Sequence, residues 1–353
     1  MRIAVDAFGS DERPGPDIEG AVMAARAWGD EIILVGPEEP IRRELARLDT
    51  RGLNLRIVHA PEVIAMDEHA NAVKAKKDAS IRVAMRLVKN GEADAFVSAG
   101  NTIACLSSAL FDLGRIRLPD GQRIERPALA TIFPVAFQKV LLLDVGATAD
   151  CDAKILLQFA RMGSIYAERV LGIARPRVGL LANGEEEEKG TMVLRDAFAL
   201  LKQSDLNFVG NVEPKEVSQG VADVVVTDGF TGNILLKGSE TVASFTKRLL
   251  KREFWEAPLG KLGLVLALPG LLLSLPGLLL LAPAFQRIAR RLDPFEYGGA
   301  LLLGVDGVVI IGHGRSNAKA IKNAIARARE AVAGQVVPTI KEGLAIWEKK
   351  EEH

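Results

Sequence analysis

The chain has little of several residue types that would mark a specialised class of protein. Its 353 residues include only two cysteines, Cys105 and Cys151, which argues against a disulfide framework and favours a reducing compartment. Aromatic residues make up 5%, too few for the stacking surfaces that bind single-stranded nucleic acid. Lys and Arg together number 45, as do Asp and Glu, so the basic excess of a general nucleic-acid binder is missing as well.

Common catalytic motifs are missing too. The chain has no GxGxxG after an apolar strand and no GxxxxGK[ST], the usual signatures of dinucleotide sites and P-loops. It has no HExxH, no GxSxG and no CxxC, which argues against a zinc protease, an α/β-hydrolase and a structural zinc site. Residues 1–12 turn acidic without a long apolar run, so we expect no signal peptide.

What the chain does have is a repeated alternation of apolar runs, polar loops and helix-like segments. The runs and their loops read IAVDAFGSD, EIILVG, ADAFVSAGNT, KVLLLDVGATADC, RVGLLANGEEEEKG, ADVVVTDGFTGN and GVVIIGHGRSN. Apolar strands separated by helices predict a three-layer α/β/α fold with a largely parallel sheet, which we treat as a single unit over residues 1–353. Loops after such strands meet at one edge of the sheet, so we expect a phosphate or acyl-phosphate cleft there, although any one loop could be a plain turn.

Seven segments, in chain order, resemble the motifs of one family. They read MRIAVDAFGSDERP, IAMDEHANAVKAKKDASI, VSAGNTIA, LDVGATADC, LLANGEEEEKG, DVVVTDGFTGNILLK and RLDPFEYGGALLLGVDGVVIIGHGRSNAKAIKNAI. Together they resemble the bacterial PlsX family of acyl-ACP:phosphate acyltransferases, from Met1 to about Ala328. Four loops depart from that family's usual residues, at 8–10, 148, 182–183 and 315.

The resemblance implies a fold similar to phosphotransacetylases and isocitrate-dehydrogenase-like enzymes. It implies transfer of a fatty acyl group from acyl carrier protein (ACP) to inorganic phosphate, giving acyl phosphate for phospholipid synthesis. It also implies a homodimer, no metal or organic cofactor, and a downstream membrane acyltransferase that consumes the product. Two alternatives stay open: a phosphotransacetylase acting on acyl-CoA, and a non-catalytic scaffold at the membrane surface.

Such a reaction must hold phosphate beside a thioester carbonyl and stabilise the oxyanion, which directs attention to three residues. Lys189 resembles the lysine of the family's GEExKG motif and is the predicted phosphate-holding cation, unless it only closes a solvated charge run. Asn233 is predicted to donate to the thioester carbonyl or to phosphate, although Asn is also a good helix cap. His313, between two glycines, is predicted to be a donor or acid near the leaving thiolate, or else a loop residue bonded to backbone.

The other predicted substrate- and phosphate-binding residues are glycines and small polar residues of the same loops. They are Gly9, Ser98, Gly100, Asn101, Thr102, Asp144, Gly184, Asp228, Gly229 and Gly232. We expect no acyl-enzyme on Cys105, which lies in an apolar helical pattern, or on Cys151, which has no His near it in sequence. A basic rim for the acidic ACP is expected, with Lys76, Lys77 and Arg82 as candidates.

One long uncharged run, Leu262–Gln286, stands apart from this pattern. Its 25 residues are long enough to cross a bilayer, but three prolines at seven-residue intervals should break a helix there. A single crossing would also separate the last strands from their sheet. Basic residues flank both ends of the run, so both ends should stay near the same anionic leaflet.

We therefore predict that residues 254–292 form an inserted apolar helical hairpin that docks on a membrane. Trp255, Leu272 and Leu279 are the predicted lipid contacts. The enzyme would then be cytoplasmic and peripherally bound to the inner face of the cell membrane, where its product is consumed. A dimer interface or a pair of core helices is the alternative for the same segment.

Overall fold

A computed structural model describes the chain from residue 1 to 351, except 119–120, 134–137, 257, 259–262, 264–265, 268, 271–273, 292–295 and 297. The strands are β1 (Arg2–Asp6), β2 (Glu31–Gly36), β3 (Leu55–His59), β4 (Ala95–Ser98), β5 (Ala128–Ile132), β6 (Leu141–Leu143), β7 (Val178–Leu181), β8 (Phe208–Val212), β9 (Val224–Val226), β10 (Ala300–Leu303) and β11 (Val308–Ile311). The helices are α1 (Gly15–Trp28), α2 (Glu38–Leu45), α3 (Ala70–Ala75), α4 (Ser80–Lys89), α5 (Thr102–Ser108), α6 (Ala153–Arg169), α7 (Met192–Gln203), α8 (Pro214–Gln219), α9 (Gly229–Lys251), α11 (Leu275–Arg291), α12 (Ala318–Ala333) and α13 (Val336–Glu351). Two π-helical turns, η1 (Ala109–Leu113) and η2 (Arg252–Glu256), continue α5 and α9.

The strands form one sheet in the order β3-β2-β1-β4-β11-β10-β5-β6-β9-β7-β8. The pairings are parallel except for β11 with β10, β10 with β5, and β5 with β6. This confirms a largely parallel sheet, but the antiparallel strands in the middle reverse its direction. Strands β6, β9, β7 and β8 therefore run opposite to β1, β4 and β11, and their following loops leave from the other edge. The expectation that all the loops meet at one edge is wrong for this reason.

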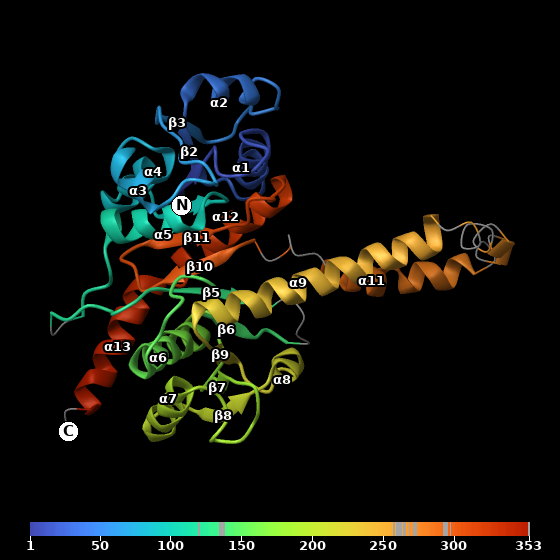
Figure 1. Cartoon of the computed structure of the whole chain (residues 1–353). Helices are drawn as coiled ribbons and strands as arrows, with labels where there is room; N and C mark the ends of the chain where they lie inside the picture. Colours follow the sequence, from blue (N-terminus) through green and yellow to red (C-terminus); the bar gives the residue numbers. More distant parts are fainter. Residues whose placement is uncertain are drawn as a thin grey trace.

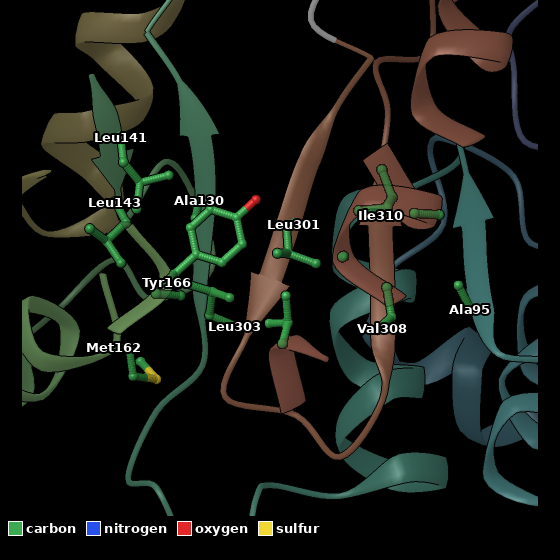
Figure 2. Close-up of a cluster of buried hydrophobic side chains, with 14 of the residues drawn as sticks. Ala95, Ala130, Leu141, Leu143, Met162, Tyr166, Leu301, Leu303, Val308 and Ile310 are labelled. Carbon is green, nitrogen blue, oxygen red and sulfur yellow. The ribbon is translucent and has the colours of Figure 1, made fainter. Parts of the chain in front are cut away.

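Both faces of the sheet are covered by helices, as the apolar strands predict. Along β1, Ile3 and Val5 belong to a buried cluster that includes side chains of α1, α6, α12 and α13. Ala4 points the other way, into a second cluster with side chains of α4 and α5. Figure 2 shows the first cluster crossing the middle of the sheet, where Leu301 and Leu303 of β10 lie near Tyr166 of α6. Each large side chain buried in this way stabilises the fold by roughly 1.5–3 kcal/mol.

The structure confirms most predicted strands and adds others. Each of the seven apolar runs contains a strand, and β1 (Arg2–Asp6), for example, includes the start of the first run. Strands β3, β5 and β8 were not among the predicted runs. They are less uniformly apolar or lie between polar segments, and β5 takes part in the antiparallel reversal that the sequence pattern does not reveal.

The arm, formed by α9, η2 and α11, projects away from the sheet (Figure 1). In the described part of the chain no helix has both the length and the apolar content to cross a membrane. Leu279, Leu280 and Leu281 of α11 are exposed. Of the predicted lipid contacts, Leu272 lies outside the described residues, and only the backbone of Trp255 is described, within η2.

The prolines do not interrupt α11. Pro276 is its second residue, where the missing N–H is tolerated, and Pro283 lies inside the helix without ending it. A proline at 283 removes the bond to the carbonyl of Leu279, whose residue is 64% exposed, so water can satisfy that carbonyl. The expected helix break at every proline is therefore wrong for Pro283.

Candidate functional site

A cavity of about 610 Å³ lies over the antiparallel strands in the middle of the sheet. Leu129 and Thr131 of β5 and Ala300 of β10 form its floor. The loops after β4 and β11 form one wall, and α9 together with Val145 and Gly146 of the loop after β6 forms the other. The volume is in the usual range for a small-molecule site.

Helix α9 is placed against the cavity by its first turn. Asp228 caps the helix, accepting 2.8 Å hydrogen bonds from the backbone N and the Oγ1 of Thr231. A Cβ at Gly232 would lie 1.9 Å from the carbonyl oxygen of Asp144, and one at Gly229 would lie 2.7 Å from Oδ2 of the same residue. Both glycines do allow a close approach, as predicted, but what approaches is the chain itself. Packing therefore accounts for Gly229 and Gly232, and capping accounts for Asp228.

The cavity face of α9 carries a stripe of residues spaced by three or four positions. Asn233, Leu236, Lys237 and Glu240 all line the cavity, as their helical spacing requires. Lys237 is the only Lys or Arg in the described lining, and Glu240 is its only carboxylate. Burial raises the pKa of Glu240, and the charges of His313 and Lys237 act in the opposite direction.

His313 enters the cavity from the loop after β11. Its neighbours Gly312 and Gly314 also line the cavity, and the side chain is exposed. Its Nδ1 accepts a 3.3 Å hydrogen bond from the backbone N of Arg315, which leaves Nε2 as the nitrogen available for a proton donor. The geometry thus gives His313 both a backbone contact and a place in the cavity, combining the two interpretations of the sequence.

The loop after β4 holds three predicted residues at the cavity: Gly100, Asn101 and Thr102. The side chain of Asn101 is fully used, because Oδ1 accepts from Ala104 N and Nδ2 donates to three carbonyl oxygens of residues 65–68. Ser98 is buried beneath this loop, where its Oγ donates to Asp6 and accepts from Gly100 N. Asn101 and Ser98 therefore shape the wall, while Thr102 is exposed in it.

Asp144 is buried below the start of α9. Its carboxylate accepts hydrogen bonds from the backbone N–H groups of Leu129, Gly146, Ala147 and Thr148, at 2.6–3.1 Å. Burial raises the pKa of Asp144, and these bonds oppose the rise. The residue is the support of the loop after β6, and it is not free to meet a ligand.

Three other predicted residues lie outside the cavity lining. Lys189 is exposed on the loop after β7, and a Cβ at Gly184 in the same loop would lie 2.8 Å from Cγ of Lys189. That loop leaves the sheet at the edge opposite to the loops of Gly100 and His313. A Cβ at Gly9 would lie 2.9 Å from the backbone N atoms of Ala99 and Gly100, so Gly9 supports the wall from behind.

The cavity thus brings together five of the predicted residues: Gly100, Asn101, Thr102, Asn233 and His313. Sequence reasoning missed Lys237 and Glu240. A helical pattern starting at Asn233 could have predicted both residues, because positions four and seven after Asn233 lie on the same face of the helix.

Neither cysteine is placed to act as a nucleophile. Burial raises the pKa of Cys105 to about 12, and burial with nearby Asp144 raises that of Cys151 to about 12. A thiol with such a pKa carries almost no thiolate at neutral pH. Within the described residues, no cluster of His, Cys, Asp or Glu is suited to hold a metal ion.

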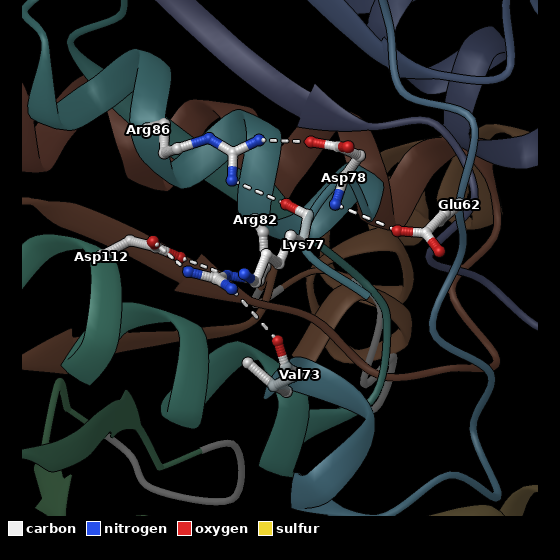
Figure 3. Close-up of polar contacts among 7 residues, drawn as sticks. All are labelled: Glu62, Val73, Lys77, Asp78, Arg82, Arg86 and Asp112. Atoms are coloured by element: carbon white, nitrogen blue, oxygen red, sulfur yellow. Dashed lines mark hydrogen bonds and ion pairs between the residues drawn. The ribbon is translucent and has the colours of Figure 1, made fainter. Parts of the chain in front are cut away.

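Two of the three candidates for a basic rim have other roles, and Figure 3 shows the contacts of one of them, Arg82. Arg82 binds Asp112 through two hydrogen bonds of 2.6 and 2.9 Å and donates to the carbonyl of Val73. Lys76 is paired with Glu68 at 2.7 Å and also donates to the carbonyl of Val63. Of the three candidates, only Lys77 is exposed.

Solved structures support the fold. The EutD phosphotransacetylase of Staphylococcus aureus aligns with a TM-score of 0.57 at 15% identity, covering 95% of this chain and 94% of that one. A phosphotransacetylase of Streptococcus pyogenes aligns with a TM-score of 0.56 at 18% identity, covering 96% and 94%. At such identities the likeness is one of fold.

Sequence relatives are much more similar. A protein of Herpetosiphon aurantiacus named phosphate acyltransferase is 49% identical, over 99% of this chain and 99% of its own length. A phosphate acyltransferase of Geotalea daltonii is 46% identical, over 94% of this chain and 90% of its own length. The family described as "Fatty acid synthesis protein" matches residues 1–339. The chain therefore belongs to the PlsX family of phosphate acyltransferases, enzymes that transfer an acyl group to phosphate.

Proposed function

We propose that this enzyme takes a fatty acyl group from the thioester of acyl-ACP and transfers it to inorganic phosphate. The observation that carries the proposal is the composition of the cavity wall. Leu129, Ile132 and Leu236 give it apolar surface for an acyl chain, while a short polar stripe on α9 faces His313. An acyl thioester and phosphate together need this combination of surfaces.

The polar groups have separate tasks in this mechanism. Lys237 holds the phosphate dianion, so that an oxygen lies beside the thioester carbonyl carbon. The side-chain amide of Asn233 donates to the oxyanion that forms when phosphate adds. The Nε2–H of His313 donates a hydrogen bond to the sulfur as the carbon–sulfur bond breaks. Lys189 stays a prediction from the family resemblance, as a second phosphate contact supplied by the loop after β7.

The donor is proposed to be ACP, and the acyl phosphate to enter phospholipid synthesis through a membrane acyltransferase. The arm supports this order of events, because its exposed leucines offer a surface on which the product can stay near lipid. Leu280 is 84% and Leu279 is 64% exposed on α11. We propose that they dock on the inner face of the cell membrane, with the rest of the enzyme in the cytoplasm.

A homodimer is proposed on a different surface of the arm. Phe230, Ile234 and Phe245 of α9 are each more than half exposed. Exposed apolar side chains in a row are unfavourable in water unless another surface covers them, and a second copy of the chain offers a matching row. Light scattering of the purified protein tests this directly. A monomeric wild type, or a dimer that Phe245→Asp leaves intact, would contradict it.

The reaction is tested by incubating the protein with palmitoyl-ACP and phosphate and trapping acyl phosphate as its hydroxamate. Phosphate-dependent hydroxamate is the expected result. Palmitoyl-CoA and acetyl-CoA should be assayed alongside, since the structural likeness to phosphotransacetylases makes CoA the rival carrier. Faster turnover with either CoA ester than with palmitoyl-ACP would replace ACP as the donor.

The membrane proposal needs a separate assay. Leu279→Asp with Leu280→Asp should remove binding to phosphatidylglycerol-containing vesicles and leave activity in solution near that of the wild type. Met192→Asp is a matched control, because Met192 is 71% exposed but lies on α7, away from the arm. Vesicle binding that survives the double substitution would show that the arm has another partner.

A further inference from the structure

Glu240 is a carboxylate in the cavity to which the mechanism so far gives no task. It is half-buried on α9, seven positions after Asn233 and three after Lys237, on the same helix face. In the described part of the chain its carboxylate takes part in no hydrogen bond or ion pair, and only the charges of His313 and Lys237 act on it. Asp144 makes the contrast clear, because four backbone N–H groups hold that carboxylate in place.

A negative charge beside a phosphate site is unfavourable unless it takes part in the reaction. Glu240 is three residues from Lys237, the proposed phosphate cation, and across from His313. Burial raises the pKa of Glu240, which makes it a better proton acceptor than a solvated glutamate. A carboxylate kept only for stability would be expected to have a donor.

The polar groups around His313 come from α9, from its own loop and from the loop after β1. Glu240 and Lys237 of α9 line the same cavity, and the charge of His313 acts on the Glu240 carboxyl. From its own loop the backbone N of Arg315 occupies Nδ1, and Asp11, after β1, packs on Gly314 through a 2.8 Å backbone bond. Asp11 lies outside the cavity lining, so Glu240 is the carboxylate that shares the cavity with His313.

We propose that Glu240 relays the proton of phosphate to the departing sulfur, while His313 holds the sulfur with a hydrogen bond from Nε2–H. The proposal rests on the thioester reaction given above. An oxygen of HPO₄²⁻ forms the new bond to the carbonyl carbon, and its P–OH proton passes to Glu240. The carbon–sulfur bond breaks, and Glu240 passes that proton to the sulfur, to which Nε2–H of His313 donates a hydrogen bond. The products are a dianionic acyl phosphate and a neutral thiol, so the relay ends in the state in which it began.

The relay separates an acceptor on the phosphate side from a donor on the sulfur side, which allows two substitutions to be told apart. Glu240→Gln removes the acceptor, so kcat should fall about 10²–10³-fold while KM for phosphate changes little. Glu240→Asp, which keeps a carboxylate one methylene further back, should recover part of the loss. Glu168→Gln is the matched control, since Glu168 is exposed on α6 and lies outside the cavity.

The thioester itself is the second variable. His313→Asn should lose about 10²-fold with palmitoyl-ACP, an alkyl thioester, because an alkyl thiolate leaves poorly unless a well-placed hydrogen bond stabilises its charge and positions it for the proton. With the thiophenyl ester of palmitate the loss should nearly disappear, since an aryl thiolate leaves unprotonated. Glu240→Gln should be impaired with both esters, because phosphate must lose its proton in either reaction. A purely structural role for either residue would not produce this dependence on the leaving group.

The outcomes separate the relay from the proposed function. If the wild type makes acyl phosphate but Glu240→Gln keeps its kcat, the relay is overturned and the thioester reaction stands. Equal losses for His313→Asn on the two esters would also overturn the relay, by making His313 a binding residue. A wild type that makes acyl phosphate from neither ester would overturn the proposed function, and the relay with it. Near-native circular dichroism and thermal midpoints in the variants are required in every case.

Discussion

The two ends of α9 have very different surroundings. Near its start, Asn233, Lys237 and Glu240 face a cavity, and Gly232 holds the helix hard against Asp144. Near its end, Leu249 and Leu250 are exposed and the helix projects away from the sheet. One continuous helix thus connects a confined polar site with an open apolar surface.

The two ends of α9 should differ in how well they tolerate substitutions. Chemistry depends on positions to within a fraction of an ångström, so a single wrong atom near the start should cost much of the activity. Docking on lipid or on a second subunit depends on summed apolar area, so single changes near the end should have graded effects. Substitutions along α9 therefore test whether the two ends work independently.

The largest effect is expected at Asn233. Asn233→Ala removes the amide donor to the oxyanion, and losing one such donor typically lowers kcat about 10²–10³-fold. Vesicle binding should be unchanged, because the substitution leaves the far end of the helix intact. The hydroxamate assay and vesicle flotation measure the two properties on the same sample.

The control for this substitution is Asn90→Ala, at an exposed position after α4. It should affect neither property. A loss below about fivefold in Asn233→Ala would contradict an oxyanion role, and a parallel loss of vesicle binding would show that the ends are coupled.

Gly232 gives the next effect, on stability. A Cβ there would lie 1.9 Å from the Asp144 carbonyl oxygen, so Gly232→Ala must push α9 away from the loop after β6. Overpacking of this kind costs about 1–3 kcal/mol, which a lowered urea midpoint would report. Activity should fall as well, because Asn233 moves with the helix. An unchanged midpoint would mean that α9 is not anchored at its start.

The sequence predicts those elements that are determined by their own residues, and it does not predict those that depend on pairing between distant residues. Strands such as Arg2–Asp6 are buried on both faces and are read from their own residues. The reversal at β10 and β5 depends on pairings between residues about 170 positions apart, and no local pattern encodes it. Missing that reversal placed the loops after β6, β7 and β9 at the wrong edge of the sheet, although Val145 and Gly146 after β6 and helix α9 after β9 still reach the cavity.

The same reversal explains which of the predicted site residues line the cavity. Gly100 and His313 follow strands of the first half and do meet, and Asn233 reaches them because α9 lines the same cavity. Asp144, Gly229 and Gly232 were chosen for real constraints, but those constraints are the protein's own packing. A helical pattern read forward from Asn233 would have found Lys237 and Glu240.

Lys237 and Lys189 allow a direct comparison between geometry and family resemblance. Lys237→Met should raise KM for phosphate about 10–100-fold, because a charge-assisted contact is worth about 1.5–3 kcal/mol. Lys189→Met should have the smaller effect, since Lys189 is exposed outside the cavity lining. Lys89→Met, at an exposed site on α4, is the control. A larger increase in KM for phosphate in Lys189→Met than in Lys237→Met would show that the loop after β7 moves to the cavity when substrate binds.

The smallest effect is expected at Gly238, between the two ends of α9. No atom lies within 4 Å of the position that a Cβ would occupy there, so Gly238→Ala removes backbone freedom without a clash. Alanine should stabilise the helix by about 0.5–1 kcal/mol, measured as a raised urea midpoint. If the two ends are independent, kcat and vesicle binding should both stay at wild-type values. A lower kcat in Gly238→Ala would instead show that motion of the arm affects the cavity. Chemistry and docking would then use different residues but would be coupled through the motion of α9.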